Sequence, residues 1–277
     1  MKKKVNVIKS DFLVTDLPSN RKELFFDILK NQWRNLLLLS LIVMVILLPL
    51  VILRYYNMVI ITNMLNSNNI ENIRNNVFNS YVAYNVINSF LIVICGILFG
   101  GVLRIYKKLS YNDGFFLGAD FLKGVKENFK DFVVIFSIYA VINFLLEILC
   151  VNFLLDNNYL YYFFKVINYL IICPIVLIWV SLSSIYSDKV IVKLKSSYKL
   201  YIRYLFKILL VFIILVLPLF FLFIGNSYIQ LFLPIGYCLL YFPYAYLIFV
   251  LFMNYIFDEQ INKKNFPDLV GKGMFVS

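Results

Sequence analysis

Long apolar stretches with almost no charged residues are the feature that most constrains how this chain can fold. A helix needs roughly 20 apolar residues to cross the hydrocarbon layer of a membrane, because that layer is about 30 Å thick and a helix rises about 1.5 Å per residue. The chain has such stretches at 36–53, 82–103, 132–155, 166–187 and 208–257, and Glu147 is the only charged residue in them. A membrane protein is therefore expected.

The last of these stretches, 208–257, is too long for one crossing. Gly225-Asn226-Ser227 near its middle is typical of a chain reversal and divides it into two helices. Because 62% of all residues are hydrophobic and only 15% are charged, the expected surrounding is lipid. We predict an all-α membrane protein whose six transmembrane helices form three hairpins within residues 36–257.

Lysine and arginine are sorted along the chain in a way that predicts its orientation. Residues 1–35 contain eight, residues 104–131 and 187–207 contain six each, and residues 258–277 contain three. The remaining cations are Arg54, Arg74 and Lys165. Since basic residues are retained on the cytoplasmic side during insertion, 1–35 and 258–277 are predicted to be a cytoplasmic N-terminal segment and a cytoplasmic tail of a multi-pass cell-membrane protein.

The net charge of +11 has the same explanation. The basic residues flank the helices and do not gather into one patch, so the sequence does not predict nucleic-acid binding. Anionic lipid headgroups are the partners that this charge favours.

Three amphipathic stretches precede the first, third and fifth predicted transmembrane helices. Each ends in a basic residue, two further residues, an aromatic residue and a second basic residue, at 30–34, 126–130 and 203–207. Helices of this kind lie in the membrane interface, so we predict three interfacial helices. The alternative is that any helix entering lipid carries aromatic and basic anchors at this point.

Three segments carry a likeness to a known family. They are Phe25 to Trp33 followed by Leu48-Pro49, the glycine-bearing stretch Gly100 to Arg104, and Asp120 to Phe129. On these segments, about the first 140 residues resemble the YesL-like bacterial integral membrane proteins, although the Asn-rich segment 57–79 departs from the compact first loop expected there. The resemblance implies a permease-like or accessory role in carbohydrate uptake, and it transfers no catalytic residues.

A few polar residues lie within the apolar stretches. Asn143 and Glu147 are four apart and share one helical face. Glu147 lies about 24 Å beyond the cytoplasmic edge of its helix, a depth that Lys165 and Arg54 should share. Pairing would offset most of the cost of a charge in lipid, which is on the order of 3 kcal/mol. The cluster is a substrate or proton site, a structural ion pair between helices, or a site where Glu147 is protonated and neutral.

Small residues and prolines also mark the predicted helices. Gly96, Gly100 and Gly101 offer a face for close helix packing within the chain. Prolines, which remove a backbone hydrogen bond and bend a helix, occur in the apolar stretches at Pro49, Pro174, Pro218, Pro234 and Pro243. Such bends either build a transport site or are static kinks.

No reaction is indicated by the sequence. The chain has no histidine, and its four cysteines lie in apolar stretches without metal-ligand spacing. We therefore expect neither catalysis nor a cofactor or metal. The favoured function is a permease-like or accessory component of a membrane transport complex, with transporter subunits as partners. The alternative is an autonomous small-solute transporter that uses Glu147, Asn143 and Lys165.

Overall fold

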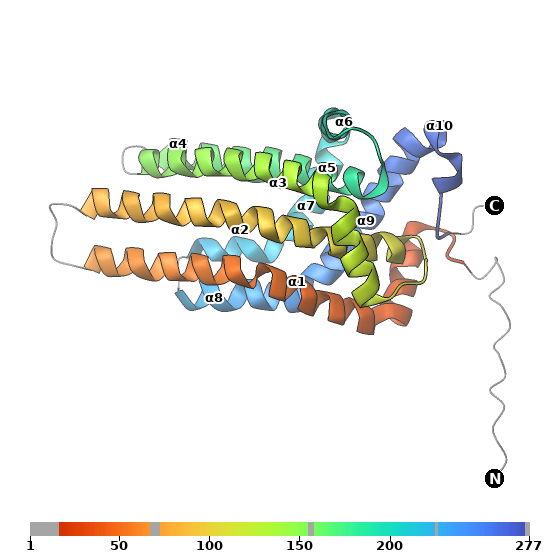
Figure 1. Cartoon of the computed structure of the whole chain (residues 1–277), viewed down its shortest axis with the longest axis horizontal. Helices are drawn as coiled ribbons and strands as arrows, with labels where there is room; N and C mark the ends of the chain where they lie inside the picture. Colours follow the sequence, from red (N-terminus) through yellow and green to blue (C-terminus); the bar gives the residue numbers. More distant parts are fainter. Residues whose placement is uncertain (1–16, 67–72, 155–157, 225–226, 275–277) are drawn as a thin grey trace, which may run out of the picture.

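The computed structural model of this chain describes residues 17–66, 73–154, 158–224 and 227–274 (Figure 1). These residues are almost entirely helical and include no strand. Six helical segments are long and apolar enough to cross a membrane: Arg21–Met64, Asn75–Ser110, Leu117–Val151, Tyr159–Ile185, Leu205–Leu222 and Tyr228–Asn265. The predicted all-helical class and the predicted number of spans are confirmed.

The first three spans are single helices, and the other three are interrupted. The uninterrupted ones are α1 (Arg21–Asn66), α2 (Ile73–Ser110) and α3 (Leu117–Leu154). The fourth span consists of α4 (Asn158–Val166), the π-helix η3 (Ile167–Ile172) and α5 (Cys173–Ile185), and is followed by α6 (Val190–Arg203). The fifth consists of α7 (Leu205–Val216) and the 3-10 helix η4 (Leu217–Ile224). The sixth consists of α8 (Ser227–Gly236), the π-helix η5 (Tyr237–Tyr241) and α9 (Phe242–Phe257), and short helices η6 (Asp258–Asn262), α10 (Lys263–Asn265) and η7 (Pro267–Leu269) follow.

One predicted boundary lies outside the described residues, and two others are not marked by a break in the helical structure. The predicted reversal at Gly225 and Asn226 falls outside the described residues, between the end of η4 and the start of α8. Helix α1 runs without a break past residue 35, and helical structure continues past residue 257. The division into a cytoplasmic segment, a membrane domain and a tail stays a prediction.

Proline explains where the interrupted spans leave the α-helical pattern. Pro174 and Pro243 stand at the first turns of α5 and α9, directly after the two π-helices, and Pro218 lies in η4. Proline has no N–H, so the carbonyl four residues earlier loses its donor. In lipid such a carbonyl must find a donor within the protein. Pro49 and Pro234, in contrast, lie inside helices α1 and α8.

Tyrosine hydroxyls supply two of the missing donors. The Tyr201 hydroxyl, from α6, donates to the Leu170 carbonyl at 2.6 Å, and Leu170 lies four residues before Pro174. The Tyr241 hydroxyl, from η5, donates to the carbonyl of Ile214 at 2.6 Å, and Ile214 lies four residues before Pro218. Each proline is thus compensated by a side chain from another element, which ties the two elements together.

Glycine brings α2 and α3 into close contact. A Cβ atom added at Gly124 of α3 would lie 2.8 Å from the Gly100 carbonyl oxygen and 2.9 Å from the Gly101 Cα of α2. Gly96 and Gly101 face the aromatic rings of Phe136 and Phe121 in α3. The predicted small-residue face therefore meets a helix of the same chain. Helix α2 packs against both α3 and α1, more extensively against α3, and the predicted division into three hairpins stays a prediction.

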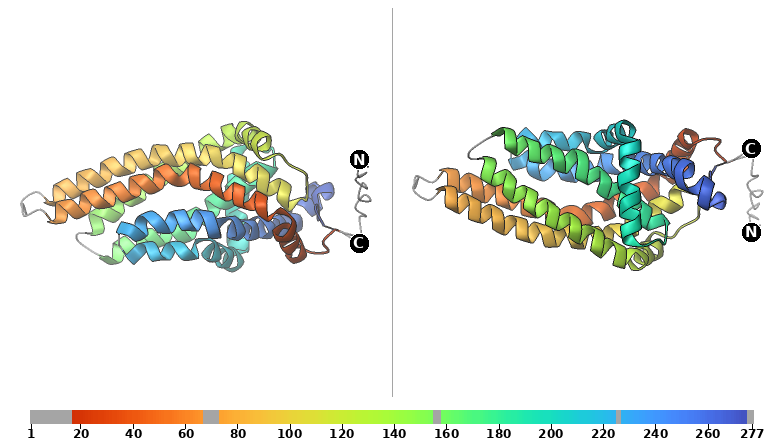
Figure 2. Two further views of the ribbon diagram at one scale, coloured as in Figure 1. Left: turned by 90° about the horizontal axis from the view of Figure 1, so that it is seen from below. Right: turned by 90° about the horizontal axis from the view of Figure 1, so that it is seen from above.

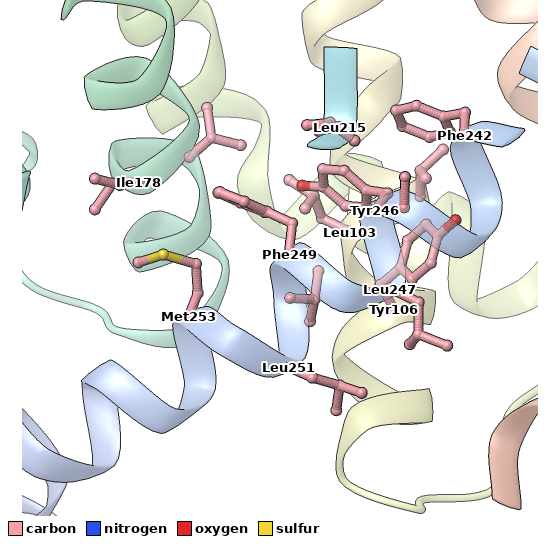
Figure 3. Packing of buried hydrophobic residues seen from close by; sticks show 14 of the residues in the cluster. Leu103, Tyr106, Ile178, Leu215, Phe242, Tyr246, Leu247, Phe249, Leu251 and Met253 are labelled. Atoms are coloured by element: carbon pink, nitrogen blue, oxygen red, sulfur yellow. The ribbon is translucent and has the colours of Figure 1, made fainter. Parts of the chain in front are cut away.

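The sixth span lies at the centre of the bundle. In its most apolar window 56% of the residues are buried inside the protein, against 28–44% in the other spans. More of the sixth span is therefore covered by other parts of the chain. Figure 3 shows Tyr246, Leu247 and Phe249 of α9 packed among side chains of α2, α5 and α7. Tyr106 of α2 stacks edge-on against Tyr246, with ring centroids 4.9 Å apart.

The described chain begins and ends at the same end of the bundle (Figure 1). The Arg21 guanidinium, at the start of α1, pairs with Asp258 at 2.7 Å, and it also donates to the carbonyls of Ser110 and Lys272 at 3.4 Å. Arg21 therefore joins the start of the first span, the end of the second and the segment after the sixth.

The three predicted interfacial helices differ in form. The stretches before spans one and three are the first turns of α1 and α3, and both turn away from the rest of their helix (Figure 1). In α1 the change falls at Gln32, whose φ of −121° and ψ of 15° are not helical. Helix α6 is separate and lies across the long axis of the bundle (Figure 2, right). A position in the membrane interface stays a prediction for all three.

The hydrogen bond from Tyr201 to Leu170 gives a first test. Tyr201→Phe should lower the free energy of unfolding by about 1–3 kcal/mol, because it leaves the partly buried Leu170 carbonyl without this donor. Thermal unfolding in detergent measures the effect. Tyr198→Phe, on the exposed side of the same helix, is the control and should behave like the wild type. Equal stability of the two variants would show that the carbonyl does not depend on Tyr201.

Candidate functional site: a polar seam between the third and fourth spans

A line of polar side chains runs along the interface between α3 and the fourth span. Tyr139, Asn143 and Glu147 are spaced four apart, so they lie on one face of α3. The fourth span meets them with Lys165 of α4, Asn168 of η3 and Cys173 at the start of α5. We call these six residues the polar seam.

Glu147 and Lys165 form an ion pair at one end of the polar seam. The Lys165 ammonium lies 2.6 Å and 2.7 Å from the two carboxylate oxygens of Glu147, and the Tyr81 hydroxyl of α2 donates to one of them at 2.6 Å. Glu147 is only 8% exposed. The Lys165 ammonium also lies 5.7 Å from the ring centroid of Tyr161, a distance at which the ring face stabilises a cation.

Amide and thiol groups continue the polar seam inward. The Asn168 amide nitrogen donates to the Asn143 side-chain oxygen at 2.8 Å, and both residues are buried. The Tyr139 hydroxyl and the Cys173 thiol lie 3.3 Å apart, and either can donate. Asn168 belongs to the π-helix that directly precedes Pro174. The departure from α-helical geometry at this proline therefore places the Asn168 amide against α3.

The predicted cluster is assembled only in part. Lys165 forms an ion pair with Glu147. Asn143 instead pairs with Asn168, and no hydrogen bond joins it to the ion pair among the described residues. Arg54 of α1 was expected to lie with them. Its side chain is exposed, and it forms no ion pair within the described ranges of the chain. Because Lys165 already contacts both Glu147 oxygens, the carboxylate does not need a second cation.

Sequence reasoning missed Tyr81, Asn168, Tyr139 and Cys173. The four-residue spacing of Glu147 and Asn143, continued one step, would have indicated Tyr139. Nothing in the sequence marks Tyr81 as the second donor to Glu147, because that contact depends on how α2 packs against α3. Asn168 could be found only by knowing that the fourth span is π-helical at that point.

The chemistry of the polar seam is that of a satisfied buried network. Glu147 accepts bonds from two side chains, and the amides of Asn143 and Asn168 bond to each other. The side-chain oxygen of Asn85, one turn inward from Tyr81 on α2, is buried and has no partner among the described residues. A groove between α2 and α3 runs nearby, but its lining is apolar except for Ser89 and Ser137 and does not include Glu147.

Comparisons with protein-family models, with curated proteins and with solved structures find no match for this chain. The six candidate spans indicate a multi-pass membrane protein, in which a buried ion pair joins two of the spans.

The ion pair gives a second test. Glu147→Gln or Lys165→Met alone should destabilise the protein by about 3–5 kcal/mol, because each leaves one buried charge without its partner. The double variant should recover much of that loss, since no isolated charge remains. Thermal unfolding of the single and double variants in detergent, read as a double-mutant cycle, measures the coupling. Additive losses would show that the two side chains do not depend on each other.

Proposed function

We propose that this protein is a non-catalytic, permease-like or accessory component of a transport complex in the cell membrane. The observation that carries the proposal is a surface at the end of the bundle where the described chain begins and ends. Apolar side chains are exposed there on three elements, the first turns of α1, the first turns of α3 and α6. They are Phe26, Trp33, Leu122, Phe129, Ile191 and Tyr198, and we call them the apolar rim.

The apolar rim suits a partner that is itself in the membrane. Lys123, Lys126 and Lys130 are exposed next to Leu122 and Phe129, and Lys195 and Lys199 are exposed on α6. Apolar side chains interleaved with lysines fit both anionic headgroups and the juxtamembrane surface of another subunit. The resemblance to YesL-like proteins supports the same role and suggests transporter subunits as that partner.

The orientation is part of the proposal. We place the apolar rim and both termini in the cytoplasm, because the basic residues cluster at this end of the bundle. A reporter fused to the N-terminus and a reporter inserted at residue 68, which lies outside the described residues, should therefore report opposite sides, with the first in the cytoplasm. The reverse assignment would contradict the orientation, and agreement between the two reporters would contradict the arrangement of spans.

Association with transporter subunits is tested by purification in a mild detergent. The wild-type protein should retain the same transporter subunits in repeated preparations. Phe129→Ser combined with Tyr198→Ser should lose them, because these changes remove exposed apolar area from two of the three rim elements. Tyr162→Ser, an exposed residue of α4 in the outer part of the bundle, is the control and should retain them. Recovery of the wild type only as a lone chain would contradict the proposal.

The polar seam favours a second candidate, an autonomous small-solute transporter. Its π-helix next to Pro174 places Asn168 opposite Asn143, an arrangement of the kind that builds transport sites at mid-membrane depth. On this alternative, the double variant Glu147→Gln, Lys165→Met should fold but lose uptake of the solute. Unchanged uptake would remove the alternative, and it would leave the accessory role untouched.

A further inference from the structure

Buried cations in this protein pair with carboxylates, and one lysine departs from that pattern. The pairs join different elements at the same end of the bundle or, for Lys165, within the polar seam. They are Arg21 with Asp258, Arg104 and Lys108 with Asp120, Lys193 with Asp131 and Lys165 with Glu147. Lys107 of α2 is partly buried, and within the described ranges it has no carboxylate partner.

Among the described residues, no carboxylate contacts the Lys107 ammonium. Its ammonium donates to one neutral acceptor, the Ser184 carbonyl, at 3.1 Å. The cations Arg104 and Lys272 act on it more strongly than the carboxylates of Glu127 and Asp113 do. A partly buried ammonium without a carboxylate in contact costs free energy, so a mobile anion would stabilise this position.

A small cavity lies beside the Lys107 ammonium, where α2, α5 and α9 meet. It is lined by Lys107, Ser181, Ser184 and Asn254 together with apolar side chains. It has room for about one water molecule or one small ion. The cavity therefore admits a single-atom ligand and excludes a metabolite.

Hydrogen-bond donors converge on this cavity. The Asn254 amide uses one N–H on the Ser110 hydroxyl at 2.8 Å and keeps a second N–H. The Lys107 ammonium and this amide N–H are the donors that line the cavity, and donors select an anion.

We propose that the cavity beside Lys107 binds one small inorganic anion of the halide class, for which chloride is the probe. A neutral water could satisfy the donors but would leave the ammonium charge uncompensated, which is why an anion is favoured. The bound ion would bridge the second, fourth and sixth spans. Its occupancy would therefore stabilise the bundle at the end where the apolar rim lies, whatever the partner of that surface is.

The test measures thermal unfolding in detergent with chloride and with gluconate at equal ionic strength. Chloride should raise the Tm of the wild type by about 2–4 °C, because it binds the folded state only. Lys107→Met should abolish the difference between the two salts. Lys123→Met, which removes an exposed lysine of α3, is the control and should keep it. Equal Tm values in the two salts, or a difference that survives Lys107→Met, would overturn the proposal.

A direct measurement covers the case in which Lys107→Met does not fold. Equilibrium binding of radiolabelled chloride to the purified wild-type chain should saturate at one ion per chain. Sulfate, which is too large for the cavity, should not compete. Absence of saturable binding would contradict the site. Phosphatidylglycerol added without chloride could also raise the Tm. If that rise depended on Lys107, the ammonium would bind a lipid headgroup, and the proposal of a halide site would be overturned.

Discussion

Every backbone carbonyl inside the hydrocarbon layer needs a donor from the protein, and this constraint shapes the second half of the molecule. Three spans carry a proline at or beside a departure from the α-helix, and each proline removes an N–H. The hydroxyls of Tyr201 and Tyr241 restore two of these bonds from neighbouring elements. A local defect thereby becomes a tertiary contact, which fixes α6 against the fourth span and the sixth span against the fifth.

The sequence was sufficient for the number of spans and for their approximate positions, because apolar length is a local property that lipid selects directly. It also indicated that Gly96, Gly100 and Gly101 form a packing face, since small side chains have few other uses on a helix surface. It did not indicate that this face meets α3. That contact depends on Gly124, which lies in a stretch read from the sequence as an amphipathic lead-in.

The polar seam shows the same limit more clearly. Glu147 and Lys165 could be paired from the sequence because both are charged and both were estimated to lie at one depth. Depth alone could not separate Lys165 from Arg54, which is exposed and forms no ion pair in the described part of the chain. The partner of Asn143 was hidden because a π-helix changes the angular position of every residue that follows it.

Arg21 and Asp258 stand 237 residues apart in the sequence, yet one ion pair joins them. Membrane helices enter the bilayer in order as the ribosome delivers them, so the beginning of the first span remains without this partner until Asp258 has been synthesised. The Lys272 carbonyl, which accepts from the same guanidinium as the Ser110 carbonyl, is added later still. This end of the bundle can therefore close only after translation has passed the last span, and a shortened chain would leave it open.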